Sequence, residues 1–261
     1  MKKIVAALDP MNTPWPVITF ATHFANNDGA SVHLVFLTLP EEVDYNYPYP
    51  NDLSAAEDFT TRKNISDSNA QLIEDNIQLF KQECESSKTR FSSEKNISIE
   101  ELIKKTEDAD ILVADEGTGF LKKVLPHIHC PALIAGENHL PEKVVLMFNN
   151  SGNSKYAIES YISVLPQFQK LPTFLLSINP DDKKENENYL NNLKSSFTDI
   201  SLKSLYGNVE NQMEDFLSGL SGHILVIMGA FGRSKISRFF YKSRANSVMK
   251  EKNFSLFIAH K

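Results

Sequence analysis

Residues 224–234 read Ile-Leu-Val-Ile-Met-Gly-Ala-Phe-Gly-Arg-Ser, an apolar run that passes directly into two closely spaced glycines. A short apolar run is typical of a strand that is buried on both faces of a parallel sheet. A glycine turn between a strand and a helix lets backbone N–H groups approach an anion, which the helix dipole also attracts. Residues 233–244 add five basic and no acidic side chains. The stretch therefore predicts a parallel α/β sheet with an anion site at the end of one strand.

The glycine spacing leaves a second interpretation open. Gly229 and Gly232 could simply make a tight connection, with the basic residues on a solvated helix face, because short glycine motifs are weakly specific. The turn lacks the Gly-Lys-Ser/Thr ending of a Walker loop and the Gly-x-Gly-x-x-Gly pattern of a dinucleotide site. Neither of those two phosphate motifs is therefore predicted.

The apolar strand pattern occurs twice, 140 residues apart. Residues 3–9 and residues 143–149 share a lysine, an apolar run and a final Asp or Asn. Each copy continues with an amphipathic helix, a second strand, a weaker third strand and two further helix–strand units. The third strand of the first copy is poorly defined around Phe91. The pattern predicts two α/β domains of five strands each, over residues 1–138 and 141–261.

The strand, turn and helix over residues 227–234, with Ser243 and a last strand beyond them, resemble the universal stress protein family. The duplicated opening strands fit the same family, and the resemblance covers nearly the whole chain as a tandem pair. It implies two tandem open parallel five-stranded sheets flanked by helices, Rossmann-like and similar to adenine nucleotide alpha hydrolases. It also implies an intramolecular pseudo-dimer, in which residues near 131–135 pair with residues near 255–259.

ATP-binding members of that family carry Gly-x2-Gly-x9-Gly-Ser/Thr for the phosphates and an Asp after the first strand for the adenosine. The resemblance therefore implies a site for ATP or another adenine nucleotide in the second half. Two residues depart from the family pattern. Lys242 replaces the third glycine and either blocks the phosphates or contacts them with its ammonium group, and Asn149 replaces the Asp. The candidate site residues are Asn149, Ile178, Gly229, Gly232, Arg233, Ser234, Lys242 and Ser243.

The first half departs further from the nucleotide-binding pattern. Only 22 positions separate Val113 from Ala135, whereas 33 separate the equivalent Val226 from Ala259. The carboxylates of Asp115 and Glu116 stand where a phosphate needs positive potential. We therefore predict that the first half binds no ATP and acts as a structural partner.

Composition excludes several classes of protein. The 261 residues include 27 Lys and Arg against 33 Asp and Glu, a net charge of −6, which argues against nucleic acid as a partner. No apolar run approaches the roughly 18 residues of a membrane span, and no signal-peptide pattern is present, so we expect a cytoplasmic location. Two cysteines, Cys84 and Cys130, make no disulfide framework.

Other groups of residues give weaker evidence for a function. No motif joins a nucleophile to a base, so we expect no enzyme. His127, His129 and Cys130, together with His139, suggest a metal, but the first three fit a helix-to-strand turn better, so no metal site is expected. The Tyr- and Pro-rich segment 40–58 is either an exposed loop or an arm for a partner.

These observations predict a stress-response protein of the universal stress protein type. An adenine nucleotide would be its regulatory ligand, bound in the second domain without catalysis. The alternative is a nucleotide-free interaction scaffold of the same fold, in which both sites are degenerate. A homodimer is possible in either case, and the protein partner stays open.

Overall fold

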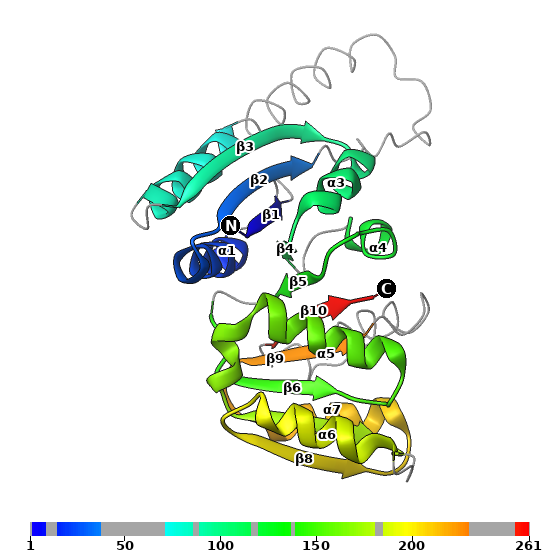
Figure 1. Ribbon diagram of the computed structural model, residues 1–261. Helices are drawn as coiled ribbons and strands as arrows, with labels where there is room; N and C mark the ends of the chain where they lie inside the picture. Colours follow the sequence, from blue (N-terminus) through cyan, green and yellow to red (C-terminus); the bar gives the residue numbers. More distant parts are fainter. Residues whose placement is uncertain are drawn as a thin grey trace, which may run out of the picture.

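The computed structural model describes residues 2–8, 15–37, 71–85, 89–115, 120–136, 139–180, 185–229 and 254–260. Within these ranges, a helix separates most successive strands, and all the strands join one ten-stranded sheet (Figure 1). The segment 40–58, Asp9 and the turn after Asp115 lie outside the described residues, so the predictions made for them remain predictions.

The first half of the sheet contains five strands with the order β3-β2-β1-β4-β5. A helix over residues 71–85 precedes β3. The other elements are β1 (Lys3–Leu8), α1 (Trp15–Asp28), β2 (Ser31–Leu37), β3 (Arg90–Ile97), α3 (Ile99–Lys105), η1 (Thr106–Asp108), β4 (Ile111–Asp115), α4 (Leu121–Val124) and β5 (Ala132–Ala135).

The second half has the same strand order when it is read from its outer edge, β8-β7-β6-β9-β10. Its elements are β6 (Lys143–Met147), α5 (Gly152–Val164), η2 (Pro166–Lys170), β7 (Thr173–Ile178), α6 (Glu185–Ser195), β8 (Ile200–Leu205), α7 (Val209–Gly219), β9 (Ile224–Gly229) and β10 (Phe254–Ala259). The predicted α/β class with an open, mostly parallel sheet flanked by helices is confirmed.

The two halves meet at the antiparallel pair β5–β10, which lies between them in Figure 1. Leu256 pairs with Ile134 and Phe257 with Leu133, as the family resemblance implied. Gly136 follows β5, where a Cβ atom would collide with the carbonyl oxygen of Phe254. Its backbone N–H donates to Ser255 Oγ at 3.3 Å. The five-stranded sheets are therefore continuous, while the domain limits at residues 138 and 141 remain a prediction.

Helices cover both faces of the sheet, which explains the apolar strand sequences. Residues of α1, of the 71–85 helix, of α5 and of α6 form one buried cluster with the strands. Residues of α3, α4 and α7 form the other. A strand between two such layers needs apolar side chains on both faces. The inner strands β1, β4, β5, β9 and β10 are accordingly buried along almost their whole length.

The edge strands β3 and β8 differ from the inner strands because most of their side chains are exposed. Exposed positions accept polar residues, so the sequence of β3 lacks a strong strand pattern. Within the described ranges, no helix has both the length and the apolar character needed to cross a bilayer.

Candidate functional site

Three of the predicted site residues lie at the carboxyl ends of neighbouring strands in the second half. Ile178 ends β7, Gly229 ends β9, and Asn149 lies two residues beyond β6. Strands β6 and β9 are adjacent, and the chain runs outward from β6 through β7 and β8 but in the opposite direction from β9 to β10. Ligands of open α/β sheets bind at such a switch point. The other predicted residues, Gly232, Arg233, Ser234, Lys242 and Ser243, lie outside the described residues.

Gly229 has a packing role that the sequence did not reveal. A Cβ atom at this position would lie 2.5 Å from the carbonyl oxygen of Asn153 and 2.9 Å from the backbone nitrogen of Ser154. Both atoms belong to the first turn of α5, so the glycine lets the helix start against the end of β9. This contact supports the tight-connection interpretation of Gly229.

Asn149 organises the start of α5. Its Oδ1 accepts hydrogen bonds from Ser151 N at 3.2 Å and from Ser151 Oγ at 2.7 Å. Ser151 in turn caps the helix, because its Oγ accepts from Ser154 N at 3.2 Å. The amide oxygen of Asn149 is therefore already used. Its amide nitrogen makes no hydrogen bond to any described residue and can donate to a ligand.

The next residue, Asn150, has a left-handed backbone with φ of 59°. Its Oδ1 is buried and accepts no hydrogen bond from the described part of the chain. A buried acceptor without a donor costs about 1–3 kcal/mol. A donor from elsewhere, such as a water molecule or a ligand, would remove this cost.

The end of β7 is closed by a reciprocal amide pair. Asn179 Nδ2 donates to the carbonyl oxygen of Gly207, and Gly207 N donates to Asn179 Oδ1, both at 2.8 Å. The side chain of Asn179 thereby extends the pairing of β7 with β8 by one step beyond Ile178. Ile178 itself is partly buried and packs on the cluster beneath α7.

Phe148, the residue before Asn149, belongs to an aromatic pair. The ring of Tyr189 from α6 stacks on Phe148, with 5.5 Å between centroids, and Lys155 Nζ lies 5.2 Å from the Tyr189 ring centroid. Burial, with a smaller contribution from Glu159, raises the pKa of Tyr189 to about 12. The tyrosine therefore stays neutral, and Lys155 holds a positive charge close to the start of α5.

The residues considered as metal ligands have other surroundings. His139 stacks on His223 with 4.4 Å between ring centroids, and His129 Nε2 lies 4.0 Å from Glu107 Oε1. Burial raises the pKa of Cys130 to about 12 and that of Cys84 to about 11, so both remain thiols. Across the ranges that the structure describes, no three His, Cys, Asp or Glu side chains converge as a metal site.

The fold is the one found in solved universal stress protein structures. A universal stress protein from Archaeoglobus fulgidus DSM 4304 superposes with a TM-score of 0.66 at 12% identity, with 99% of this chain and 96% of that chain covered. A putative universal stress protein from Pseudomonas aeruginosa UCBPP-PA14 superposes with a TM-score of 0.54 at 12% identity, with 100% and 93% covered.

The same fold also occurs in a different kind of protein. The cytoplasmic domain of a prokaryotic cation chloride cotransporter superposes with a TM-score of 0.51 at 12% identity, with 98% of this chain and 94% of that chain covered. No protein-family model and no curated protein matches the sequence. At such low identities the likeness defines the fold and leaves the function to be argued from the site.

Proposed function

We propose that the chain is a cytoplasmic stress-response protein of the universal stress protein type. Its second half binds ATP or another adenine nucleotide as a regulatory ligand and does not turn it over. The observation that carries this proposal is the position of Asn149 and Gly229 on either side of the switch point between β6 and β9. The likeness to universal stress protein structures over nearly the whole chain supports it.

In this proposal the phosphates lie on the turn that follows β9. The backbone at Gly232, Arg233 and Ser234 and the hydroxyl of Ser243 bind the phosphate oxygens, and Lys242 adds its ammonium group. The adenine ring lies on Ile178, and the amide nitrogen of Asn149 donates to the ribose. A bound nucleotide would also bring a donor near Oδ1 of Asn150, which accepts no hydrogen bond from the described residues.

The test is direct analysis of the protein's small-molecule content. The full chain is purified without added nucleotide and denatured, and the released molecules are identified by chromatography and mass spectrometry. We expect stoichiometric adenine nucleotide from the wild type. Two variants, Ile178→Glu and Gly232→Asp, place a carboxylate against the base or the phosphates and should lose it.

A charge-matched control separates local from general effects. Tyr206 is 68% exposed and follows the outermost strand β8 at the same edge of the sheet. Tyr206→Glu adds the same charge away from the switch point and should retain the nucleotide. An empty wild-type protein that also shows no thermal shift with millimolar ATP and magnesium contradicts the proposal.

The alternative is a nucleotide-free interaction scaffold, and a specific observation favours it. Three large apolar side chains around edge strand β8 are exposed, namely Leu202, Tyr206 and Val209. Protein–protein interfaces often form at unpaired strand edges and exposed apolar side chains. An empty wild-type protein whose self-association or partner binding is lost in Leu202→Glu would establish this second function.

A further inference from the structure

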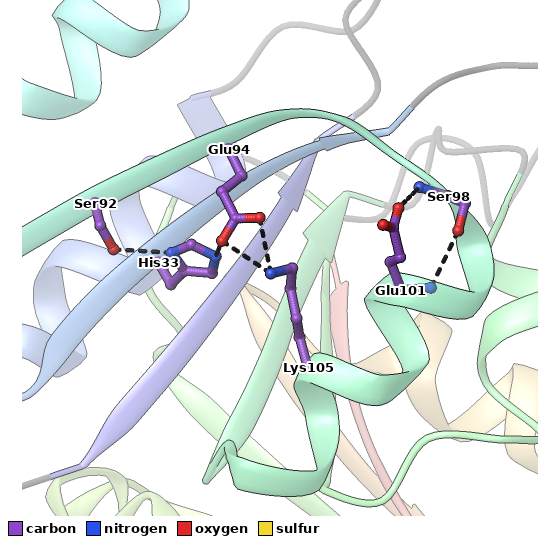
Figure 2. Close-up of polar contacts among 6 residues, drawn as sticks. All are labelled: His33, Ser92, Glu94, Ser98, Glu101 and Lys105. Carbon is purple, nitrogen blue, oxygen red and sulfur yellow. Dashed lines mark hydrogen bonds and ion pairs between the residues drawn. The ribbon is translucent and has the colours of Figure 1, made fainter.

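A second polar cluster lies in the first half, away from the carboxyl ends of the strands. It occupies the face of the sheet that α3 covers, where β2 and β3 pair (Figure 2). His33 of β2 stands in register with Ser92 of β3, and Glu94 follows two residues later on the same face. Lys105 reaches the cluster from the last turn of α3.

Hydrogen bonds join the four side chains in a chain. Ser92 Oγ lies 2.8 Å from His33 Nδ1, and His33 Nε2 lies 3.0 Å from Glu94 Oε1. Lys105 Nζ donates to the two carboxylate oxygens of Glu94 at 2.8 and 2.9 Å. Figure 2 shows the imidazole between the serine and the carboxylate.

The direction of these bonds follows from the chemistry of the groups. An ionised carboxylate only accepts, so Nε2 of His33 carries the proton and donates to Glu94. Nδ1 then holds the free lone pair and accepts from the hydroxyl of Ser92. The serine proton therefore already points at a base whose tautomer a carboxylate fixes.

Neighbouring contacts hold this arrangement in place. Ser98 and Glu101 form a capping box at the start of α3, with hydrogen bonds of 2.8 and 3.1 Å, which anchors the helix that carries Lys105. The hydrogen bond from Lys105 keeps the pKa of Glu94 below its usual value, so the carboxylate stays ionised. Partial burial lowers the pKa of His33 despite the opposing effect of Glu94, so the imidazole is neutral near pH 7.

The cluster opens into a surface cavity of about 230 Å³ that His33, Ser92, Glu94 and Lys105 line together with Lys3 and Ser31. Ser92 is exposed, so a substrate can reach its hydroxyl. The side-chain ammonium of Lys3 makes no ion pair with any described residue. It supplies a positive charge that can stabilise an oxyanion formed in the cavity.

We propose that Ser92 is a nucleophile for acyl transfer, with His33 as its general base and Glu94 as the positioning residue, and that the substrates are small activated acyl esters. Ser92 Oγ attacks the acyl carbonyl carbon while its proton moves to His33 Nδ1. The bond to the leaving alkoxide breaks, and His33 returns the proton to that oxygen. Water then cleaves the acyl-serine by the same route in reverse and releases the acid. This proposal is independent of nucleotide binding in the second half.

The test uses the full chain with p-nitrophenyl acetate and with a fluorophosphonate probe, followed by peptide mapping. We expect both reagents to modify Ser92, the fluorophosphonate with loss of fluoride. Ser92→Ala and His33→Gln should slow p-nitrophenol release by about 100-fold. Ser93→Ala, at the exposed neighbouring position on β3, should leave the rate unchanged.

A pair of cysteine variants tests the activation without any ester. The same histidine should activate a thiol in Ser92→Cys, so iodoacetamide should alkylate it about tenfold faster at neutral pH than the thiol in Ser93→Cys. His33→Gln should abolish this difference. Peptide mapping separates these sites from the buried Cys84 and Cys130.

Two outcomes overturn the proposal. One is modification that persists in Ser92→Ala at the wild-type rate, and the other is equal alkylation of Ser92→Cys and Ser93→Cys. The reaction rate should also fall as pH is lowered through the pKa of His33, which lies below its ordinary value. The groups that face this imidazole are Lys3 of β1, Ser92 and Glu94 of β3, and Lys105 of α3.

Discussion

The two halves of the molecule share one strand order but place different chemistry on it. In the first half Val5, His33 and Ser92 stand in register across β1, β2 and β3. The equivalent row in the second half is Val145, Phe174 and Ser201 across β6, β7 and β8. His33, which bonds Ser92, thus corresponds to Phe174. The Phe174 ring packs edge-on against Phe216, with 5.7 Å between the ring centroids.

The contrast continues two residues further along the edge strand. Glu94 on β3 corresponds by register to Lys203 on β8, so the second half also lacks the carboxylate. At the carboxyl ends of the strands, the second half has a helix start that Gly229 allows and Ser151 caps. One framework therefore accepts polar groups at either end of its strands, provided that the inner strands remain apolar.

Substitutions at the β5–β10 junction should have the largest effect on stability. They test whether the two halves unfold as one cooperative unit. Phe257 of β10 is fully buried, packs edge-on against Tyr161 at 6.0 Å and pairs with Leu133 of β5. Phe257→Ala removes a large side chain from the junction and should lower the free energy of unfolding by about 3–5 kcal/mol. Urea unfolding followed by circular dichroism measures it.

Leu133→Ala, on the other side of the same pair, should destabilise by about 2–5 kcal/mol and shift the same single transition. Two separate transitions, of which only one responds to each variant, would mean that the halves fold independently.

The next effect concerns the glycine at the end of β9. Gly229→Ala forces a methyl group against the backbone of Asn153 and should cost about 1–3 kcal/mol. Gly152→Ala is the matched control in the same helix turn, because nothing lies within 4 Å of its added Cβ. That control should stabilise by about 0.4–1 kcal/mol. Equal thermal midpoints for the two variants would show that α5 does not start against β9.

A smaller effect compares one helix cap from each half. Ser98 caps α3 and Ser151 caps α5, each through a serine oxygen that accepts a backbone N–H. Either serine changed to alanine should lower the free energy of unfolding by about 1 kcal/mol. Ser151→Ala should also release Asn149, and so weaken nucleotide binding as measured by calorimetry. Unchanged nucleotide affinity in that variant would show that Asn149 does not contribute to ligand binding.

The smallest effect is on the pH dependence of stability. Burial lowers the pKa of His33, so below its ordinary value of about 6.5 the unfolded chain binds more protons than the folded chain. Stability from this residue is complete above that value and declines as the pH falls. His33→Phe, which copies Phe174, should therefore lose less stability than the wild type between about pH 7.5 and pH 5.5. Parallel pH curves would contradict this account.

The sequence was sufficient for the framework because burial on both faces leaves an uninterrupted apolar run. Residues 4–8 and 224–228 are apolar throughout, and both lie in inner strands. Strand β3 was poorly defined because its exposed positions tolerate Ser, Glu and Lys. Which strands meet at the junction was implied by the resemblance to the universal stress protein family.

The sites were less predictable, since they depend on contacts between distant segments. The contact of Gly229 with α5 involves Asn153, which no local motif connects to it. His33 and Ser92 are 59 positions apart, and only the register of β2 and β3 brings them together. An isolated histidine in an otherwise apolar strand was the one available signal. Its partner Ser92 could be identified only once the pairing of β2 with β3 was known.

The junction between β5 and β10 has a consequence for how the chain is made. Ile134 and Leu256 are paired, yet about 120 residues separate them in the sequence. During synthesis on the ribosome, the edge of β5 therefore stays unpaired until β10 becomes available. An unpaired apolar edge is a template for aggregation. We therefore expect the need for chaperones to fall only after β10 has left the ribosome and paired with β5.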